Sequence, residues 1–257
     1  MQKTAMAIAA HPDDIEFMMA GTLLLLKEQG YAIHYMNLST GNCGSTEHDA
    51  ATTTAIRMEE AKNSARLMGA MFHPPICDDF EILYGVELLR KLAAVIRQVK
   101  PAIILTHSPS DYMEDHMNTS RLAVTAAFVR GVPNFTADYP AIANTNCAVY
   151  HALPHGLLTP LGQPVIPELF MDTTSVQPVK RRALLAHKSQ QNWLEDSQKM
   201  NSYVQAMEDF SRAIGNMSGQ FEHSEGWRRH LHFGFSEPGY DPLTELKEFY
   251  LKNKNYA

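Results

Sequence analysis

The amino-acid sequence predicts an α/β protein, with a Rossmann-like, mostly parallel sheet flanked by helices and an irregular C-terminal part. In the first half of its 257 residues, short apolar runs alternate with longer stretches of helical periodicity, which is the pattern of βαβ units. Apolar residues make up 45% and charged residues 19% of the chain, ordinary globular usage that excludes disorder and coiled-coil rods. No long linker interrupts the pattern, so we expect one domain over residues 1–257.

Strands and helices are expected in alternation through the first half of the chain. Short apolar runs predict strands over residues 5–10, 31–38 and 102–105. Apolar side chains at helical spacing predict helices over residues 15–29, 55–68, 86–99 and 117–130. Three of these helices are followed by Gly30, Gly69 and Gly131, and the other by Pro101, because neither residue type continues a helix well.

The second half of the chain is less regular. Its apolar runs predict strands over residues 149–153 and 168–172, and a further strand within residues 219–239. Helices are expected over residues 179–200, 202–217 and 242–252. In the first of these, Leu184, Leu185 and Trp193 are expected to face inward.

Charge, hydropathy and cysteine content exclude several classes of partner. A net charge of −6 gives no general attraction to nucleic acid, and no apolar stretch approaches the roughly 20 residues that cross a bilayer. Three scattered cysteines, Cys43, Cys77 and Cys147, are too few for a disulfide framework and are expected to be reduced thiols. We therefore expect a cytoplasmic protein without a nucleic-acid or membrane partner; the sequence leaves a homo-oligomer open.

Polar clusters follow two of the predicted strands. His11-Pro12-Asp13-Asp14 comes directly after the first strand, and residues 111–116 follow the strand at 102–105. The carboxyl ends of parallel strands meet at one edge of a sheet, so His11, Asp14 and His116 are positioned to bind one metal ion. Such a set leaves a position for water, whose pKa zinc lowers to about 7, and Asp13 is then free to act as general base. The same ligands suit Fe²⁺ as well as Zn²⁺.

Structural roles are the alternatives for these residues. Asp13 or Asp14 could cap the following helix through its backbone N–H groups. Asp115, next to His116, could fix an imidazole tautomer or cap the next helix. The cluster around Trp227 could stack on a ligand or form a plain edge strand.

Several motifs together resemble the PIG-L/LmbE-like zinc-dependent de-N-acetylases, and the resemblance covers most of the chain. The most specific is the Ala-His-Pro-Asp-Asp motif at residues 10–14. The others are Leu38-Ser39-Thr40-Gly41, Arg57-Met58-Glu59-Glu60-Ala61, Asp115-His116, and Ala186-His187-Lys188-Ser189-Gln190.

The resemblance implies a hydrolase that removes an acyl group from an N-acylated small molecule, an amino-sugar conjugate of the N-acetylglucosamine type. It implies zinc bound by His11, Asp14 and His116, with zinc-hydroxide attack and Asp13 as general base. Arg57 matches a position that faces the substrate; the alternative is a surface arginine paired with Glu60. His187 and Ser189 are expected to tie the late helix to the sheet.

Two residues depart from the pattern of this family. Many relatives carry a histidine that stabilises the oxyanion where this chain has Met113, whose thioether cannot donate a hydrogen bond. His107, His151 and His155 are candidate replacements. Asn42 stands where an acidic residue is common, which removes a charge near the substrate. The alternatives are therefore a metal-binding sensor or attenuated enzyme, or a metallohydrolase of another amide or ester.

Overall fold

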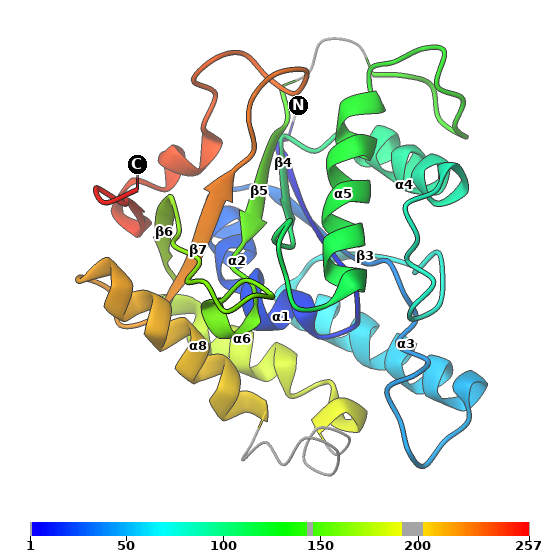
Figure 1. The fold of residues 1–257 in the computed structure, drawn as a ribbon, viewed down its shortest axis with the longest axis horizontal. Helices are drawn as coiled ribbons and strands as arrows, with labels where there is room; N and C mark the ends of the chain where they lie inside the picture. Colours follow the sequence, from blue (N-terminus) through cyan, green and yellow to red (C-terminus); the bar gives the residue numbers. More distant parts are fainter. Residues whose placement is uncertain (1, 143–145, 192–202, 257) are drawn as a thin grey trace.

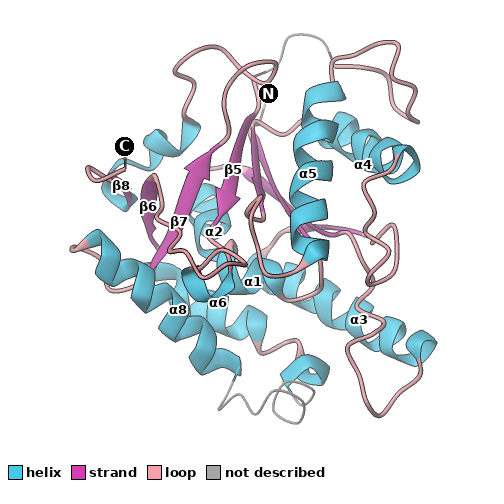
Figure 2. Ribbon diagram, in the orientation of Figure 1, coloured by secondary structure: helices cyan, strands magenta, loops and turns pink. Residues whose placement is uncertain are grey.

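The computed structural model, which describes residues 2–142, 146–191 and 203–256, contains an eight-stranded sheet with helices on both faces (Figures 1 and 2). The strand order is β3-β2-β1-β4-β5-β7-β6-β8. The first five strands in this order pair in parallel, whereas β7, β6 and β8 pair antiparallel. The predicted fold class is therefore confirmed, and the antiparallel strands account for the less regular second half.

The strands are β1 (Thr4–Ala9), β2 (Ala32–Asn37), β3 (Met71–His73), β4 (Ile103–Thr106), β5 (Ala148–Ala152), β6 (Leu169–Asp172), β7 (Ser224–Arg229) and β8 (Tyr250–Lys252). The α-helices are α1 (Asp14–Met18), α2 (Ala20–Glu28), α3 (Ala50–Met68), α4 (Val86–Val99), α5 (Glu114–Val129), α6 (Gln177–Leu184) and α8 (Tyr203–Ser218). A 3-10 helix spans Pro242–Phe249. Among the described residues, no helix combines the length and the apolar character needed to cross a membrane.

The central strand β1 is buried on both sides, as a strand between two helical layers must be. Ala5 and Ala7 pack in one core with α1, α2, α3, α6 and α8, whereas Met6 and Ile8 pack in the other core with α4 and α5. The alternation of side chains along an extended strand thus supplies both cores from consecutive residues.

Most predicted strands lie within one or two residues of their expected bounds, and α4 has the predicted bounds. The prediction over residues 242–252 was wrong in type, because a 3-10 helix there is followed by β8, which pairs with β6. Helix α3 begins at Ala50, earlier than expected, because the Asp49 carboxylate caps it by accepting the Thr52 N–H at 2.8 Å. The short strand β3 was not predicted.

The helix expected over residues 15–29 is divided at Met19 into α1 and α2. The reason is a carboxylate from a distant strand, because Glu225 on β7 accepts the N–H groups of Gly21 and Thr22 at 2.8 Å each. A buried carboxylate at the amino end of a helix satisfies N–H groups that have no partner within the helix.

The predicted helix over residues 179–200 also ends early, at Leu184. Residues 185–187 leave the helical path and helical structure resumes at residue 188, while Trp193 lies outside the described residues. Leu184 is buried and Leu185 is partly buried against the same core, as predicted.

Trp227 lies in the interior of the sheet, because its strand β7 runs between β5 and β6. The indole is fully buried and its Nε1–H donates to Thr22 Oγ1 at 2.9 Å. Neither a ligand-stacking role nor an edge strand fits this position, so both alternatives for Trp227 were wrong.

Glu225 carries a negative charge in the interior and is compensated by Lys180 of α6. Their side chains are 1% and 0% exposed, and Lys180 Nζ lies 2.6 Å from Glu225 Oε1. Glu225 thus connects β7 with α2 through its two hydrogen bonds and with α6 through Lys180.

We expect Lys180→Met to lower the free energy of unfolding by about 3–5 kcal/mol, because Glu225 is left buried without its cation. Urea denaturation measures the change. The matched control is Lys3→Met, which removes the exposed ion pair of Lys3 and Glu245 at 2.7 Å and costs at most about 1 kcal/mol. Equal losses in the two variants would contradict a structural role for the buried pair.

Candidate functional site

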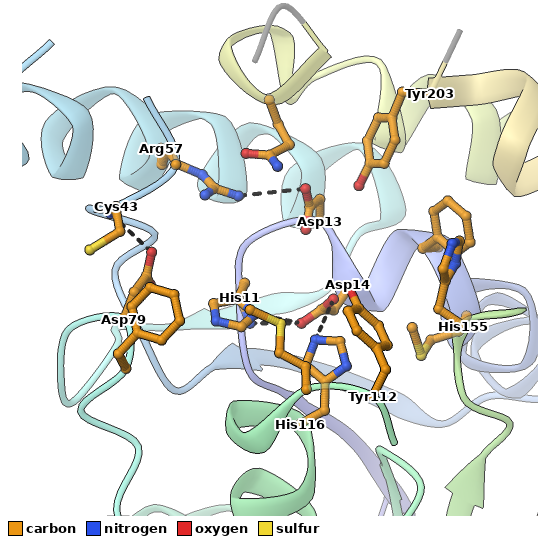
Figure 3. A pocket seen from close by; sticks show the side chains of 16 residues that line it. His11, Asp13, Asp14, Cys43, Arg57, Asp79, Tyr112, His116, His155 and Tyr203 are labelled. Carbon is orange, nitrogen blue, oxygen red and sulfur yellow. Dashed lines mark hydrogen bonds and ion pairs between the residues drawn. The ribbon is translucent and has the colours of Figure 1, made fainter. Parts of the chain in front are cut away.

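The polar turn after β1 and the start of α5 meet at the carboxyl edge of the sheet, where they line a cavity of about 410 Å³ (Figure 3). The sheet brings them together because β1 and β4 are parallel neighbours in register, with Ile8 opposite Thr106. Helix α5 begins at Glu114, three residues before the predicted start, so His116 lies in its first turn and reaches the cavity. The cavity is thus at the edge where ligands bind in open parallel sheets.

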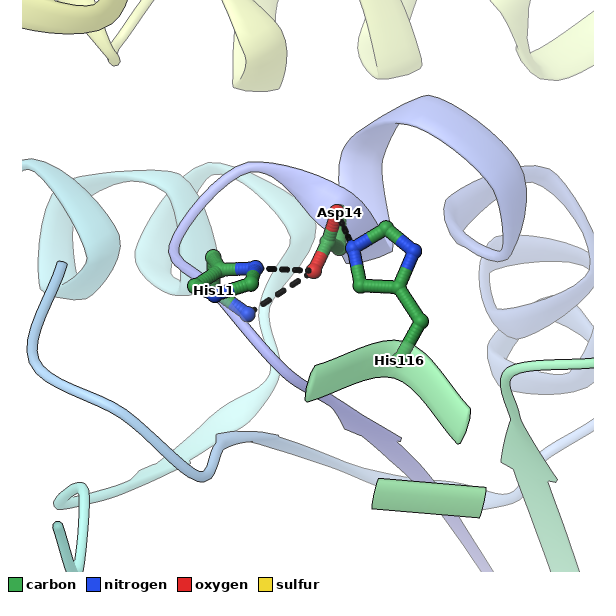
Figure 4. Close-up of side chains that lie close together, drawn as sticks. All are labelled: His11, Asp14 and His116. Atoms are coloured by element: carbon green, nitrogen blue, oxygen red, sulfur yellow. Dashed lines mark hydrogen bonds and ion pairs between the residues drawn. The ribbon is translucent and has the colours of Figure 1, made fainter. Parts of the chain in front are cut away.

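His11, Asp14 and His116 lie around one point, with their ligand atoms within 4.8 Å of one another. His11 Nδ1 is 3.4 Å from Asp14 Oδ2, and His116 Nε2 is 3.4 Å from Asp14 Oδ1. The two imidazoles approach the carboxylate from opposite sides (Figure 4). Two histidines and one carboxylate are a usual ligand set for zinc or iron with a position left for water.

The outer nitrogen of each imidazole is held by a carboxylate. Asp115 Oδ2 lies 3.0 Å from His11 Nε2 and also accepts the Phe80 N–H at 2.8 Å. Asp111 Oδ1 lies 3.0 Å from His116 Nδ1. Carboxylates in this position fix the tautomer and direction of metal-binding imidazoles. Asp115 therefore orients His11 and does not cap α5; the role of Asp111 was missed, although it lies in the cluster at residues 111–116.

The charges around Asp14 fit a bound cation. Burial opposes ionisation of Asp14, but His116 and His107 hold its pKa well below the usual range. Burial alone would lower the pKa of His11, yet Asp115 and Asp14 raise it to about 9. In the same way Asp14 and Asp111 raise the pKa of His116 to about 10 against its burial. Protonation is thus favoured at both imidazoles, each of which directs one nitrogen at Asp14. A metal ion bound at this point would take the place of the protons on His11 Nδ1 and His116 Nε2.

Asp13 lies beside these residues with its carboxylate free of the helix. Its φ of 102° is unusual for a residue with a side chain, and the carboxylate makes no capping hydrogen bond to α1. Asp14 Oδ2 accepts the N–H of His11, which precedes the helix. The helix-cap alternative is therefore wrong for Asp13. Such strain persists where the surrounding structure enforces it, often at functional sites.

Two side chains approach Asp13 from opposite sides (Figure 3). Arg57 Nη2 lies 3.5 Å from Asp13 Oδ2, and the Tyr203 hydroxyl at the start of α8 points toward the Asp13 carboxylate. Burial raises the pKa of Asp13 to about 6 against the opposing charge of Arg57, and Asp14 adds to the rise. Tyr203 was missed, because nothing in its local sequence distinguishes it from other helical core residues.

Arg57 is buried, and its guanidinium is occupied by the loops of the site. Nη2 donates to Pro12 O at 2.6 Å and Nη1 donates to Gly41 O at 3.2 Å. Glu60 instead accepts hydrogen bonds from Ser189. The alternative of a surface Arg57–Glu60 pair was therefore wrong.

His187 and Ser189 anchor the segment after α6. His187 Nε2 lies 3.1 Å from Glu16 Oε1 on α1, and the Ser189 N–H and Oγ–H donate to the Glu60 carboxylate on α3 at 2.9 and 2.6 Å. These residues hold the segment to α1 and α3 rather than directly to the sheet.

Met113 lines the cavity and cannot donate a hydrogen bond into it. Of the three histidines considered as replacements, His155 also lines the cavity, whereas His107 and His151 do not. His107 stacks on His116 with ring centroids 4.1 Å apart and accepts the Ala10 N–H, and His151 contacts Ser120 and His230.

Asn42 lies outside the lining of the cavity and holds a neighbouring loop. Its Oδ1 accepts the N–H of Asp79 at 2.9 Å, and the Asp79 carboxylate accepts the N–H groups of Gly41 and Cys43. The amide of Asn42 thus supports the loop that carries Asp79, which does line the cavity.

The chain is similar in sequence to proteins of known family. A family model described as PIG-L, GlcNAc-PI de-N-acetylase, matches residues 6–127. A diacetylchitobiose deacetylase of Thermococcus kodakarensis is 29% identical over 195 residues, which cover 73% of this chain and 70% of the relative. A 4-oxalmesaconate hydratase of Pseudomonas putida is 30% identical over 202 residues, which cover 76% of each protein.

The fold is also found among solved structures. The crystal structure of GalB, the 4-carboxy-2-hydroxymuconate hydratase from Pseudomonas putida, superposes with a TM-score of 0.75 at 24% identity. The match covers 90% of this chain and 97% of that protein.

We expect the purified protein to contain about one zinc or iron ion per chain, and His116→Ala to lose it, because two remaining ligands bind metal weakly. Elemental mass spectrometry on proteins purified without chelator measures the content. His48→Ala, which removes an exposed histidine distant in sequence from the ligands, is the control and should keep the metal. A metal content unaffected by His116→Ala, or no metal after reconstitution, would exclude this ligand set.

Proposed function

The chain belongs to the PIG-L family, and on this premise we propose that it is a metal-dependent deacetylase acting on an N-acetylated sugar conjugate. The observation that carries the proposal is the carboxylate of Asp13, which caps no helix and lies in the same cavity as the group formed by His11, Asp14 and His116. The deacetylase among its sequence relatives supports the reaction class.

The residues of the site divide the work of amide hydrolysis. His11, Asp14 and His116 would hold Zn²⁺ or Fe²⁺, which when bound lowers the pKa of water and polarises a carbonyl. Asp13 accepts the proton of the attacking water and transfers it to the leaving nitrogen, so that the C–N bond breaks and acetate and an amine are released. A carboxyl whose pKa is about 6 is mostly ionised at neutral pH and still returns the proton readily.

The cavity also favours a neutral substrate over an anionic one. Arg57 is the one lysine or arginine among the described residues that line it, and its guanidinium already contacts Asp13, Pro12 and Gly41. A substrate carboxylate would therefore find, in the described lining, no lysine and no arginine whose terminal nitrogens are free of the protein. An N-acetylated sugar needs no such partner.

Hydration of an unsaturated carboxylate is a second candidate, favoured by the similarity to the Pseudomonas hydratase. The two reactions give different products, so a substrate panel separates them. Release of free amine from N-acetylglucosamine or diacetylchitobiose supports the deacetylase. Loss of near-UV absorbance of a conjugated enoate, without amine release from any N-acetyl substrate, would assign the hydratase.

We expect Asp13→Asn to keep its metal and to lose about 100- to 10,000-fold in kcat, because an amide cannot accept the proton. Amine release is followed by a fluorogenic assay, and metal content is measured on the same sample. Full activity in this variant would remove Asp13 from the mechanism. Loss of both metal and activity would instead assign Asp13 to metal binding.

Met113→His distinguishes an active enzyme from an attenuated enzyme or a sensor. We expect kcat to rise by less than about tenfold, because the cavity is already lined by side chains with N–H or O–H groups that can donate a hydrogen bond to the oxyanion. Steady-state kinetics of both proteins on the same N-acetyl substrate measure the ratio. A gain of about 100-fold or more would show that the parent is attenuated.

A further inference from the structure

Gln190 is a buried polar side chain of the cavity to which the proposed function assigns no role. It belongs to the helical segment at residues 188–191 and is 8% exposed. Two residues that precede it are fixed to different helices, because His187 contacts Glu16 on α1 and Ser189 donates a hydrogen bond to Glu60 on α3. The segment therefore presents Gln190 to the cavity on an anchored backbone.

The two ends of the Gln190 carboxamide have different surroundings. Oε1 is buried in the cavity wall and has no hydrogen-bond partner among the described residues. The absence of a side chain at Gly44 makes room for this oxygen, because an added Cβ there would lie 3.1 Å from Gln190 Oε1 and 2.4 Å from Arg57 Nη1. Gln190 Oε1 and the guanidinium of Arg57 thus both border Gly44, in the buried part of the cavity wall.

The amide end is the one that reaches the cavity. Among the described residues Nε2 has no hydrogen-bond partner, and unlike Oε1 it is not sealed from solvent. Gln190 and Asp13 both line this cavity, and Arg57, which lies 3.5 Å from the Asp13 carboxylate, borders Gly44 as Gln190 does, so the free N–H groups of Gln190 face the same cavity as the base. Met113, by contrast, presents only a thioether.

We propose that Gln190 is a catalytic residue, whose Nε2–H donates a hydrogen bond to the acyl oxygen of the substrate as negative charge develops on it. A donor aimed at the oxyanion must reach the same acyl group as the base, and Gln190 and Asp13 line the same cavity. A neutral donor also suits a cavity that already holds the charges of Asp13 and Asp14. The inference rests on the proposed function, because it names a role in the same reaction.

The first test is Gln190→Met, which keeps the length of the side chain and removes the donor. We expect kcat on N-acetylglucosamine to fall about 100- to 1000-fold, as for other oxyanion donors, with KM, metal content and melting temperature unchanged. The control is Gln98→Met on the exposed side of α4, which should match the wild type. The inference would be overturned if kcat were unchanged in Gln190→Met. It would also be overturned if the loss of kcat were matched by an equal loss of bound metal or of folded protein.

The second test needs no turnover and uses methylphosphonate, whose tetrahedral anionic oxygens mimic the transition state. Calorimetry on the metal-loaded proteins should show at least tenfold weaker binding to Gln190→Met than to the wild type. His155→Phe is measured in parallel, and a loss confined to that variant would assign the donor to His155 and reject Gln190. A wild type that releases no amine, yet shows the Gln190-dependent binding, would disprove the deacetylase and with it the catalytic role, and would leave Gln190 as an anion-binding donor only.

Discussion

The buried carboxylate of Asp14 is the constraint on which the arrangement of the site depends. An ionised carboxylate that is removed from water is stable only beside compensating positive charge. His11 and His116 lie on opposite sides of it, and their outer nitrogens are held by Asp115 and Asp111. Protons on the imidazoles or a divalent cation between them can both supply that charge. The turn after β1 and the start of α5 are therefore held together by charge as well as by strand pairing.

Carboxylates from other elements also determine where helical segments around the site begin. Glu225 satisfies the N–H groups at the start of α2 and so separates it from α1, which carries Asp14. Glu60 does the same for the segment that begins near Ser189. In both places a carboxylate from another element takes the place of a local cap, and the chain turns where an uninterrupted helix would have continued. Each turn directs a side chain toward the cavity.

This dependence on distant residues explains how much the sequence could predict. Strand and helix alternation and the meeting of His11, Asp14 and His116 follow from local periodicity and from the parallel order of neighbouring strands. The break at Met19 could not be predicted, because Glu225 lies 204 residues from the helix start that it caps. Tyr203 was missed for the same reason, since only the packing of α8 against the first half brings its hydroxyl to Asp13.

The proposed metal ligands and several walls of the cavity come from different parts of the chain, which bears on why one relative is a deacetylase and another a hydratase. The family model covers residues 6–127, which include the proposed metal ligands His11, Asp14 and His116 and the proposed base Asp13. His155, Gln190 and Tyr203, which complete the walls of the cavity, all lie beyond it. A metal ion that activates water serves both hydrolysis of an amide and addition to a double bond, so the reaction is decided by what the walls donate to the substrate. Arg57 from the first half of the chain, whose guanidinium bonds the loops, and the neutral polar side chains from the second half suit the acyl oxygen of the proposed deacetylase reaction better than a carboxylate.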